Sequence, residues 1–120
     1  MSDRQTLPSL DGVFAPVAYR DGGIDLLDQT RLPHETVVRR LETVDATAEA
    51  IRVMRVRGAP AIGITAAYGM VLAAETSGER LDPARMDAAA QALRKTRPTA
   101  VNLEWAIDRM LTVYRVQQDS

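Results

Sequence analysis

The chain contains no cysteine, a single histidine and few aromatic side chains, and each scarcity excludes a class of site. Without cysteine, its 120 residues can hold no disulfide, no thiolate metal centre and no thiol nucleophile. His34 lies beside Pro33 and has no second histidine or cysteine with which to share a metal ion, so we interpret it as a structural loop residue. The sequence therefore predicts no metal centre.

An excess of one charge and long apolar runs are also missing. Fifteen basic and sixteen acidic residues leave a net charge of -1, and aromatic residues make up 4% of the chain. Nucleic-acid binding needs a basic surface with interleaved aromatics, so we exclude that class. The longest uncharged run, residues 58–74, is too short and too rich in alanine and glycine to span a membrane. Residues 1–12 lack the order of a signal peptide, and we expect a cytoplasmic protein with a flexible segment there.

The sequence that is present has the size and composition of one globular domain, which we place at residues 13–120. Residues 17–20 and 24–27 flank Asp21-Gly22-Gly23, whose glycines tolerate the positive φ angles of a tight turn, and this pattern predicts a β-hairpin. Residues 36–41 predict a third strand. A sheet of three strands is marginal alone, so we expect a helix against one of its faces.

From Thr43 onward the apolar residues recur every three or four positions, which predicts four helices. The first runs from about Thr43 to Met54. The second begins at Pro60 and runs to about residue 74, with small residues on one face, at positions 59, 63 and 67, that let a neighbouring backbone approach. We expect it to be the central helix.

The third predicted helix is capped by Asp82 and starts at Pro83, and the fourth starts near Pro98. In the fourth helix we interpret Trp105 and Tyr114 as core residues. Its apolar surface is so wide that we expect a second domain or a partner subunit to cover part of it. The predicted fold class is α+β, a small antiparallel three-stranded sheet followed by a four-helix, bundle-like region.

Two arginines stand directly ahead of predicted helices. Arg57 precedes Gly58, Ala59 and Pro60 at the start of the second helix, and Arg97 precedes the fourth. A helix start presents unpaired N–H groups and a partial positive charge, and arginine adds a forked set of donors that matches phosphate or carboxylate oxygens. The sequence therefore predicts two anion cradles that could converge on one ligand.

A simpler interpretation stays open at this point. Arg57 could belong to a solvated surface together with Arg52 and Arg55, and Thr99 could only cap the fourth helix, since helix starts that contain proline are common. Asp25 and Asp28 are interpreted as solvated polar positions, because nothing in the sequence marks them as an acid–base pair.

The same segments resemble the methylthioribose-1-phosphate isomerase family. The resemblance runs from about residue 17 to residue 114 and rests on ordered motifs: Leu27-Asp28-Gln29 with Leu32-Pro33, Met54-Arg55-Val56-Arg57-Gly58-Ala59-Pro60-Ala61-Ile62-Gly63 with Ala66-Ala67-Tyr68-Gly69, and Arg97-Pro98-Thr99-Ala100-Val101-Asn102-Leu103 with Trp105-Ala106. The wider family includes ribose-1,5-bisphosphate isomerases and regulatory subunits of the factor that exchanges guanine nucleotide on translation initiation factor two.

The resemblance implies an aldose–ketose isomerisation of 5-methylthioribose 1-phosphate to 5-methylthioribulose 1-phosphate in methionine salvage, by a homodimer without metal or organic cofactor. It implies that Arg57, Gly58, Ala59 and Arg97 contact the phosphorylated sugar. In the family a second, Rossmann-like domain carries the catalytic cysteine and an aspartate, and we expect that domain to be absent from this chain, which has no cysteine. We therefore expect the N-terminal, substrate-binding part of such an enzyme, inactive when isolated. The alternatives are a regulatory, protein-interaction module and a ribose-1,5-bisphosphate isomerase-like domain.

Overall fold

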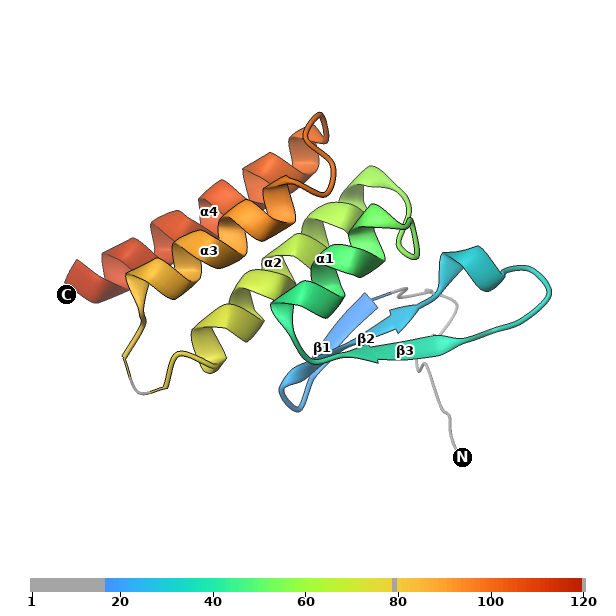
Figure 1. Ribbon diagram of the computed structural model, residues 1–120, viewed down its shortest axis with the longest axis horizontal. Coiled ribbons are helices and arrows are strands. Elements are labelled where there is room, and N and C mark those ends of the chain that lie inside the picture. Colours follow the sequence, from blue (N-terminus) through green and yellow to red (C-terminus); the bar gives the residue numbers. More distant parts are fainter. Residues whose placement is uncertain (1–16, 79, 120) are drawn as a thin grey trace.

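The described part of the chain folds into a three-stranded antiparallel sheet and four α-helices (Figure 1). The computed structural model describes residues 17–78 and 80–119, so the flexible segment predicted at residues 1–12 and the predicted domain start at residue 13 lie outside the described residues. The strands are β1 (Val17–Arg20), β2 (Gly23–Leu27) and β3 (Val38–Leu41), in that order across the sheet. This confirms the predicted hairpin and third strand, although β3 begins two residues later than predicted.

The helical elements are one short 3-10 helix and, where the apolar residues recur every three or four positions, four α-helices in the described residues. They are η1 (Gln29–Arg31), α1 (Val44–Arg52), α2 (Ala59–Glu75), α3 (Pro83–Arg94) and α4 (Val101–Asp119). Thr43 and Asp82 cap α1 and α3, because their side-chain oxygens accept hydrogen bonds of 3.0 Å from first-turn N–H groups. Met54 lies beyond the end of α1 with a φ of 66°, so the first helix is shorter than predicted.

The elements stack in three layers. The sheet lies on one side of α1 and α2, and α3 and α4 lie on the other (Figure 1). Helix α2 is the central element, as predicted, since it contacts the other three helices and the first two strands. Its side chains Ile62, Ala66 and Met70 are buried, and burial of such apolar area is the main force that holds the layers together.

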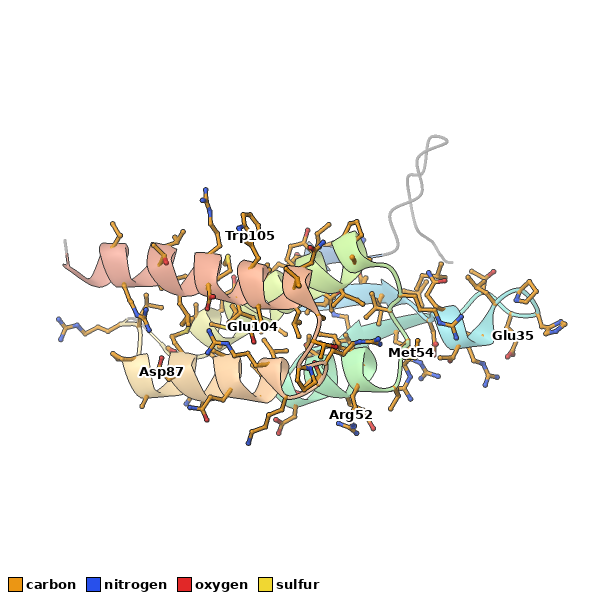
Figure 2. All side chains as sticks on the ribbon, turned by 90° about the horizontal axis from the view of Figure 1, so that it is seen from above. Glu35, Arg52, Met54, Asp87, Glu104 and Trp105 are labelled. Atoms are coloured by element: carbon orange, nitrogen blue, oxygen red, sulfur yellow. The ribbon has the colours of Figure 1, made fainter. Side chains whose placement is uncertain are left out.

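Helix α4 buries only one of its faces. Leu103, Ile107 and Leu111 are buried toward α2 and α3, whereas Trp105 is 66% exposed and points away from α3 (Figure 2). The prediction that Trp105 is a core residue was therefore wrong. Two helical positions separate it from both Leu103 and Ile107, which rotates it to the opposite face. Tyr114 is half-buried against the core, as predicted.

Other exposed apolar side chains lie on the same helix. They are Val101, Val113 and Val116. Part of the wide apolar surface predicted for the fourth helix is thus buried by α2 and α3, and the rest is open to solvent. Among the described residues, no helix is long and apolar enough to cross a bilayer.

Candidate anion-binding site

The starts of α2 and α4 lie at the same end of the helical layers. The two helices run in the same direction from that end (Figure 1). They approach closely at Gly63, where an added Cβ atom would lie 3.3 Å from the backbone oxygen of Asn102. The small residue predicted to allow a close backbone approach does so, and the neighbour is the first turn of α4. The partial positive charges of two helix starts therefore act on the same region.

The start of α2 has no side-chain cap. Gly58 occupies the cap position with a φ of 90°, a conformation that favours glycine, and no side chain accepts a hydrogen bond there. Pro60 stands in the first turn, and the Ile62 N–H donates to the Gly58 carbonyl over 2.9 Å. Gly58, Ala59 and Pro60 are exposed. The first-turn N–H groups of α2 consequently remain available to an anion, unlike those that Thr43 and Asp82 cap in α1 and α3.

The start of α4 is built from a turn. The Ala100 N–H donates to the Arg97 carbonyl over 3.0 Å, and the Glu104 N–H donates to the Ala100 carbonyl over 3.2 Å. The Thr99 side chain is exposed and makes no hydrogen bond to any residue that the structure describes. The alternative in which Thr99 caps this helix therefore has no support in the structure, and its hydroxyl group is accessible.

Arg57 and Arg97 form no ion pair with another residue in the described ranges 17–78 and 80–119. Arg57 is exposed, and Arg97 is partly buried in the turn ahead of α4. The nearby arginines Arg55 and Arg94, in contrast, form ion pairs. Arg55 contacts Asp28 and Glu49, and Arg94 donates to Glu104 over 3.1 Å and also to Asp108. The arginines directly ahead of the two helix starts thus have no acidic partner among the described residues, a state that they share with Arg52 of α1.

Asp28 contacts Arg55, two residues ahead of Arg57, and the sequence did not indicate this contact. We predicted that Asp25 and Asp28 are solvated, and this was wrong, because they are 8% and 0% exposed. Asp25 accepts hydrogen bonds from Arg20 over 2.6 Å and from Arg40 over 3.0 Å. Both carboxylates are buried because arginines from neighbouring parts of the chain neutralise them.

The Asp28 carboxylate receives donors from three segments. Its Oδ1 accepts from the Thr30 N–H over 2.9 Å and from the Thr30 hydroxyl over 2.5 Å. Its Oδ2 accepts from Arg39 Nε and lies 3.5 Å from Arg55 Nε. Burial alone would raise the pKa of Asp28, but the hydrogen bonds from Thr30 and Arg39 outweigh it and hold that pKa below its ordinary value. The group is therefore ionised at neutral pH.

One local signal could have identified Asp28. Aspartate two residues ahead of threonine is typical of a turn in which the carboxylate caps the following N–H groups, and the structure has that turn at η1. The approach of Arg39 and Arg55 is a tertiary feature, since they lie on β3 and on the segment after α1. The interpretation of Arg55 as a surface residue was wrong for the same reason.

Two grooves lie elsewhere on the described surface. One of about 310 Å³ lies between α3 and α4, and one of about 530 Å³ lies between α1 and α3. Neither is lined by Arg57 or Arg97. Within the described ranges, no cluster of three histidine, aspartate or glutamate side chains could hold a metal ion, and His34 is exposed. The geometry therefore provides an open, positively charged surface at two helix starts.

Fold and site together define a small α+β domain in which two adjacent helix starts are each preceded by an arginine without an acidic partner among the described residues. Residues 55–120 match the model of the initiation factor 2 subunit family, and the chain belongs to that family. The match contains both arginine motifs and all of α2, α3 and α4.

Relatives within this family carry isomerase names. The chain is 56% identical over 95 residues to a methylthioribose-1-phosphate isomerase of Desulforudis audaxviator, covering 78% of this chain and 27% of that protein. It is 50% identical over 101 residues to a 5-deoxyribose 1-phosphate isomerase of Moorella thermoacetica, covering 81% and 28%. These matches confirm the resemblance found in the sequence. The chain spans less than a third of the length of these relatives.

Two solved structures share the fold. The 5-methylthioribose 1-phosphate isomerase of Pyrococcus horikoshii superposes with a TM-score of 0.79 at 39% identity, covering 88% of this chain and 30% of that one. The translation initiation factor eIF-2B subunit delta from A. fulgidus gives a TM-score of 0.73 at 40% identity, covering 81% and 29%. The predicted α+β fold, a sheet followed by four helices, is confirmed.

Proposed function

We propose that this chain is the substrate-binding part of an isomerase that converts 5-methylthioribose 1-phosphate to 5-methylthioribulose 1-phosphate in methionine salvage. The observation that carries the proposal is the pair of adjacent helix starts, each preceded by an arginine without an acidic partner among the described residues. Identity of 50% or more to isomerases with related names supports the same assignment.

Each proposed contact follows from the chemistry of a sugar phosphate. The guanidinium groups of Arg57 and Arg97 would each offer two parallel N–H donors to phosphate oxygens. Gly58 would let the phosphate approach the backbone, and the Ala59 N–H, in the first turn of α2, would donate to it. Fixed donors of this kind hold a substrate in place before any bond changes.

The acid and base that transfer protons during the isomerisation would lie outside this chain. Moving hydrogen between adjacent carbons requires a positioned acid and base. We propose that the cysteine and aspartate which the family resemblance assigns to a Rossmann-like second domain supply them, because this chain contains no cysteine. The isolated chain should then bind substrate without turnover. A homodimeric enzyme and a cytoplasmic location are further predictions from the sequence.

The proposed site would recognise the phosphate of the substrate and not its substituent at C5. The two relatives act, by their names, on a 5-methylthio sugar and on a 5-deoxy sugar, each with a 1-phosphate. A site made of arginines and backbone N–H groups recognises the part that these sugars share. We therefore propose ribose 1-phosphates modified at C5 as the substrate class, with the methylthio sugar as its first member.

A second candidate function is a regulatory module that binds another protein. The similarity to the eIF-2B subunit delta from A. fulgidus and the exposed apolar residues of α4 favour it. In that case the face carrying Trp105, rather than the helix starts, would be the functional surface. A ribose-1,5-bisphosphate isomerase-like domain would use the same helix starts for a substrate with a second phosphate.

Titration of the isotope-labelled chain with 5-methylthioribose 1-phosphate tests the proposal. We expect amide chemical-shift changes at Gly58, Ala59 and the turn that holds Arg97. Replacing Arg57 by alanine should weaken binding by roughly 10- to 100-fold, the effect of losing a charge-assisted hydrogen bond. Arg52→Ala is the matched control, because Arg52 is exposed and has no ion pair with a described residue.

Turnover provides the complementary test. The chain mixed with the remaining part of an isomerase relative should convert the sugar, whereas either component alone should not. Ribose 1,5-bisphosphate, titrated in parallel, separates the two sugar-binding alternatives. Unchanged shifts and absent turnover, together with binding of a protein partner that Trp105→Gln abolishes, would establish the regulatory module instead.

A further inference from the structure

The anion-binding surface depends on a segment that belongs to no helix or strand. Residues 53–58 connect α1 to α2 and place Arg57 and Gly58. Two of them, Met54 and Gly58, have positive φ angles, of 66° and 90°. A connection between two helices can adopt several backbone conformations. Contacts with residues outside the segment must therefore stabilise this one.

Arg55 provides most of the contacts that select this path. Its N–H donates to the Ala50 carbonyl of α1 over 2.9 Å, and its carbonyl accepts from the Gln29 N–H of η1 over 2.8 Å. Its side chain lies 3.5 Å from Asp28 Oδ2. Val56 is 1% exposed, so the next side chain is buried as well. The segment is held at residues 55 and 56 and leaves Arg57 and Gly58 exposed.

Asp28 joins this segment to the sheet. It follows β2 directly, its N–H donates to the Val37 carbonyl over 2.8 Å, and its carboxylate also receives Arg39 of β3. A fully buried carboxylate is stable only with such donors around it, so the position of Asp28 and the position of Arg55 constrain each other. Arg55 lies two residues ahead of Arg57, the first of the exposed residues that we assign to phosphate binding.

We propose that Asp28 is a positioning residue for the anion-binding surface, which it orients through Arg55 without touching the substrate. This inference rests on the proposed function for its ligand, a C5-modified ribose 1-phosphate. Asp28 anchors the connection between α1 and α2 so that Arg57 and the free N–H groups of α2 face the same region as the start of α4.

Asp25 offers a matched control for this proposal. It lies on β2, three residues before Asp28, is also buried, and also receives two arginines, Arg20 and Arg40. Neither of these arginines lies in the connection between α1 and α2. Asp25→Asn and Asp28→Asn therefore remove the same charge from similar surroundings, and only the second should disturb the anion-binding surface.

Amide spectra of the free chain test the positioning without a ligand. Asp28→Asn should shift or broaden the resonances of Gly58 and Ala59, and Asp25→Asn should leave them in place. With 5-methylthioribose 1-phosphate, Asp28→Asn should weaken binding by on the order of 10- to 100-fold, the scale expected when a binding group is misplaced by about 1 Å. Asp25→Asn should bind like the unaltered chain, measured under conditions in which both variants are folded.

Arg55→Gln is the second variant if Asp28→Asn fails to fold. It leaves the bonds of Asp28 to Thr30 and Arg39 intact and removes the ion pairs of Arg55 with Asp28 and with Glu49. Arg52→Gln is its control. Unchanged Gly58 resonances in both Asp28→Asn and Arg55→Gln would overturn the positioning role, whatever the affinity. Failure of the unaltered chain to bind any ribose 1-phosphate, with the resonances shifted in the variants, would instead overturn the proposed function alone.

Discussion

At the scale of single residues, arginines divide into those that hold the fold together and those that remain available. Arg39, Arg40 and Arg94 neutralise buried or neighbouring carboxylates. Arg57 and Arg97 have no acidic partner within the described part of the chain. An anion that reached these two side chains would not have to displace an existing ion pair. This difference, more than the total charge of -1, supports the proposed binding surface at the helix starts.

The pH dependence of stability should reveal the ionised state of Asp28. Because its pKa in the folded chain is lowered from the ordinary value of 3.8, its stabilising effect is complete above that value. It is lost as the pH falls through the lower pKa of the folded state. At pH 7, Asp28→Asn should lower the free energy of unfolding by about 1 to 3 kcal/mol, because hydrogen bonds to a buried charge are lost.

Urea unfolding of the unaltered chain and of Asp28→Asn, from pH 7 to pH 2, measures the contribution of the Asp28 charge to the free energy of unfolding. The difference between them should shrink as the pH falls below 3.8, where the unfolded chain protonates Asp28, and should vanish below the lower pKa of the folded state. A difference that stays constant over the whole range would show that the charge of Asp28 does not contribute to stability.

At the scale of elements, small residues in α2 set the distance between helices. Gly63 lies against the backbone of Asn102 at the start of α4, and Gly69 lies against side-chain methyl groups of Leu93 and Thr47. The Gly63 contact is with a backbone carbonyl, which cannot move by changing rotamer. The spacing of the two helix starts therefore depends on the absence of a side chain at residue 63.

Gly63→Ala should affect ligand binding more than stability. The gain in helix propensity, about 1 kcal/mol, offsets much of the cost of the 3.3 Å contact with Asn102, so the net change in unfolding free energy should stay within about 1 kcal/mol. The affinity for 5-methylthioribose 1-phosphate should fall several-fold, because α4 must shift away from α2.

Gly69→Ala is the comparison for this prediction. An added methyl group there would meet Leu93 at 3.1 Å and Thr47 at 3.2 Å, away from the start of α4. It should destabilise the chain by about 1 kcal/mol through overpacking and leave the affinity unchanged. Equal affinity losses in the two variants, measured by calorimetry, would argue against a specific role for the α2–α4 spacing.

At the scale of the whole molecule, the chain leaves one side of its outer layer uncovered. The exposed face of α4 contains Trp105, whose ring lies 5.9 Å from the guanidinium carbon of Arg109. Apolar side chains gathered on one helix face are typical of a surface that another domain or subunit covers. This agrees with the proposal that the substrate-binding part works together with a catalytic domain.

Substitutions on the two faces of α4 should therefore change the free energy of unfolding by very different amounts. Trp105→Gln should change the free energy of unfolding by at most about 0.5 kcal/mol, because the side chain is 66% exposed. Ile107→Ala should cost about 2 to 5 kcal/mol, because Ile107 is fully buried and leaves a cavity. Denaturant unfolding at several protein concentrations measures both. A large, concentration-dependent loss in Trp105→Gln would mean that a second copy of the chain already covers this face.

Local patterns in the sequence determined which elements form. The hairpin turn, the cap at Asp82 with Pro83 and the recurrence of apolar residues are decided within a few positions of the chain, and each is present in the structure. The turn is shorter than predicted, because Asp21 and Gly22 have the positive φ angles and Gly23 is the first residue of β2. The arginine at each helix start could be recognised for the same reason. The contribution of Arg57, Gly58, Ala59 and Arg97 to binding stays a prediction.

Tertiary structure alone decided which polar side chains are buried and which apolar ones are exposed. Asp28 looked like an ordinary polar residue and Trp105 like an ordinary core residue, because the partners that decide their burial come from distant parts of the chain. Asp28 is buried because Arg39 and Arg55 reach it from another strand and another connection. Trp105 is exposed because α2 and α3 contact the face of α4 that carries Leu103 and Ile107. The spacing along α4 places Trp105 on the face opposite Leu103 and Ile107, but only the meeting of elements in space decides which of the two faces is buried.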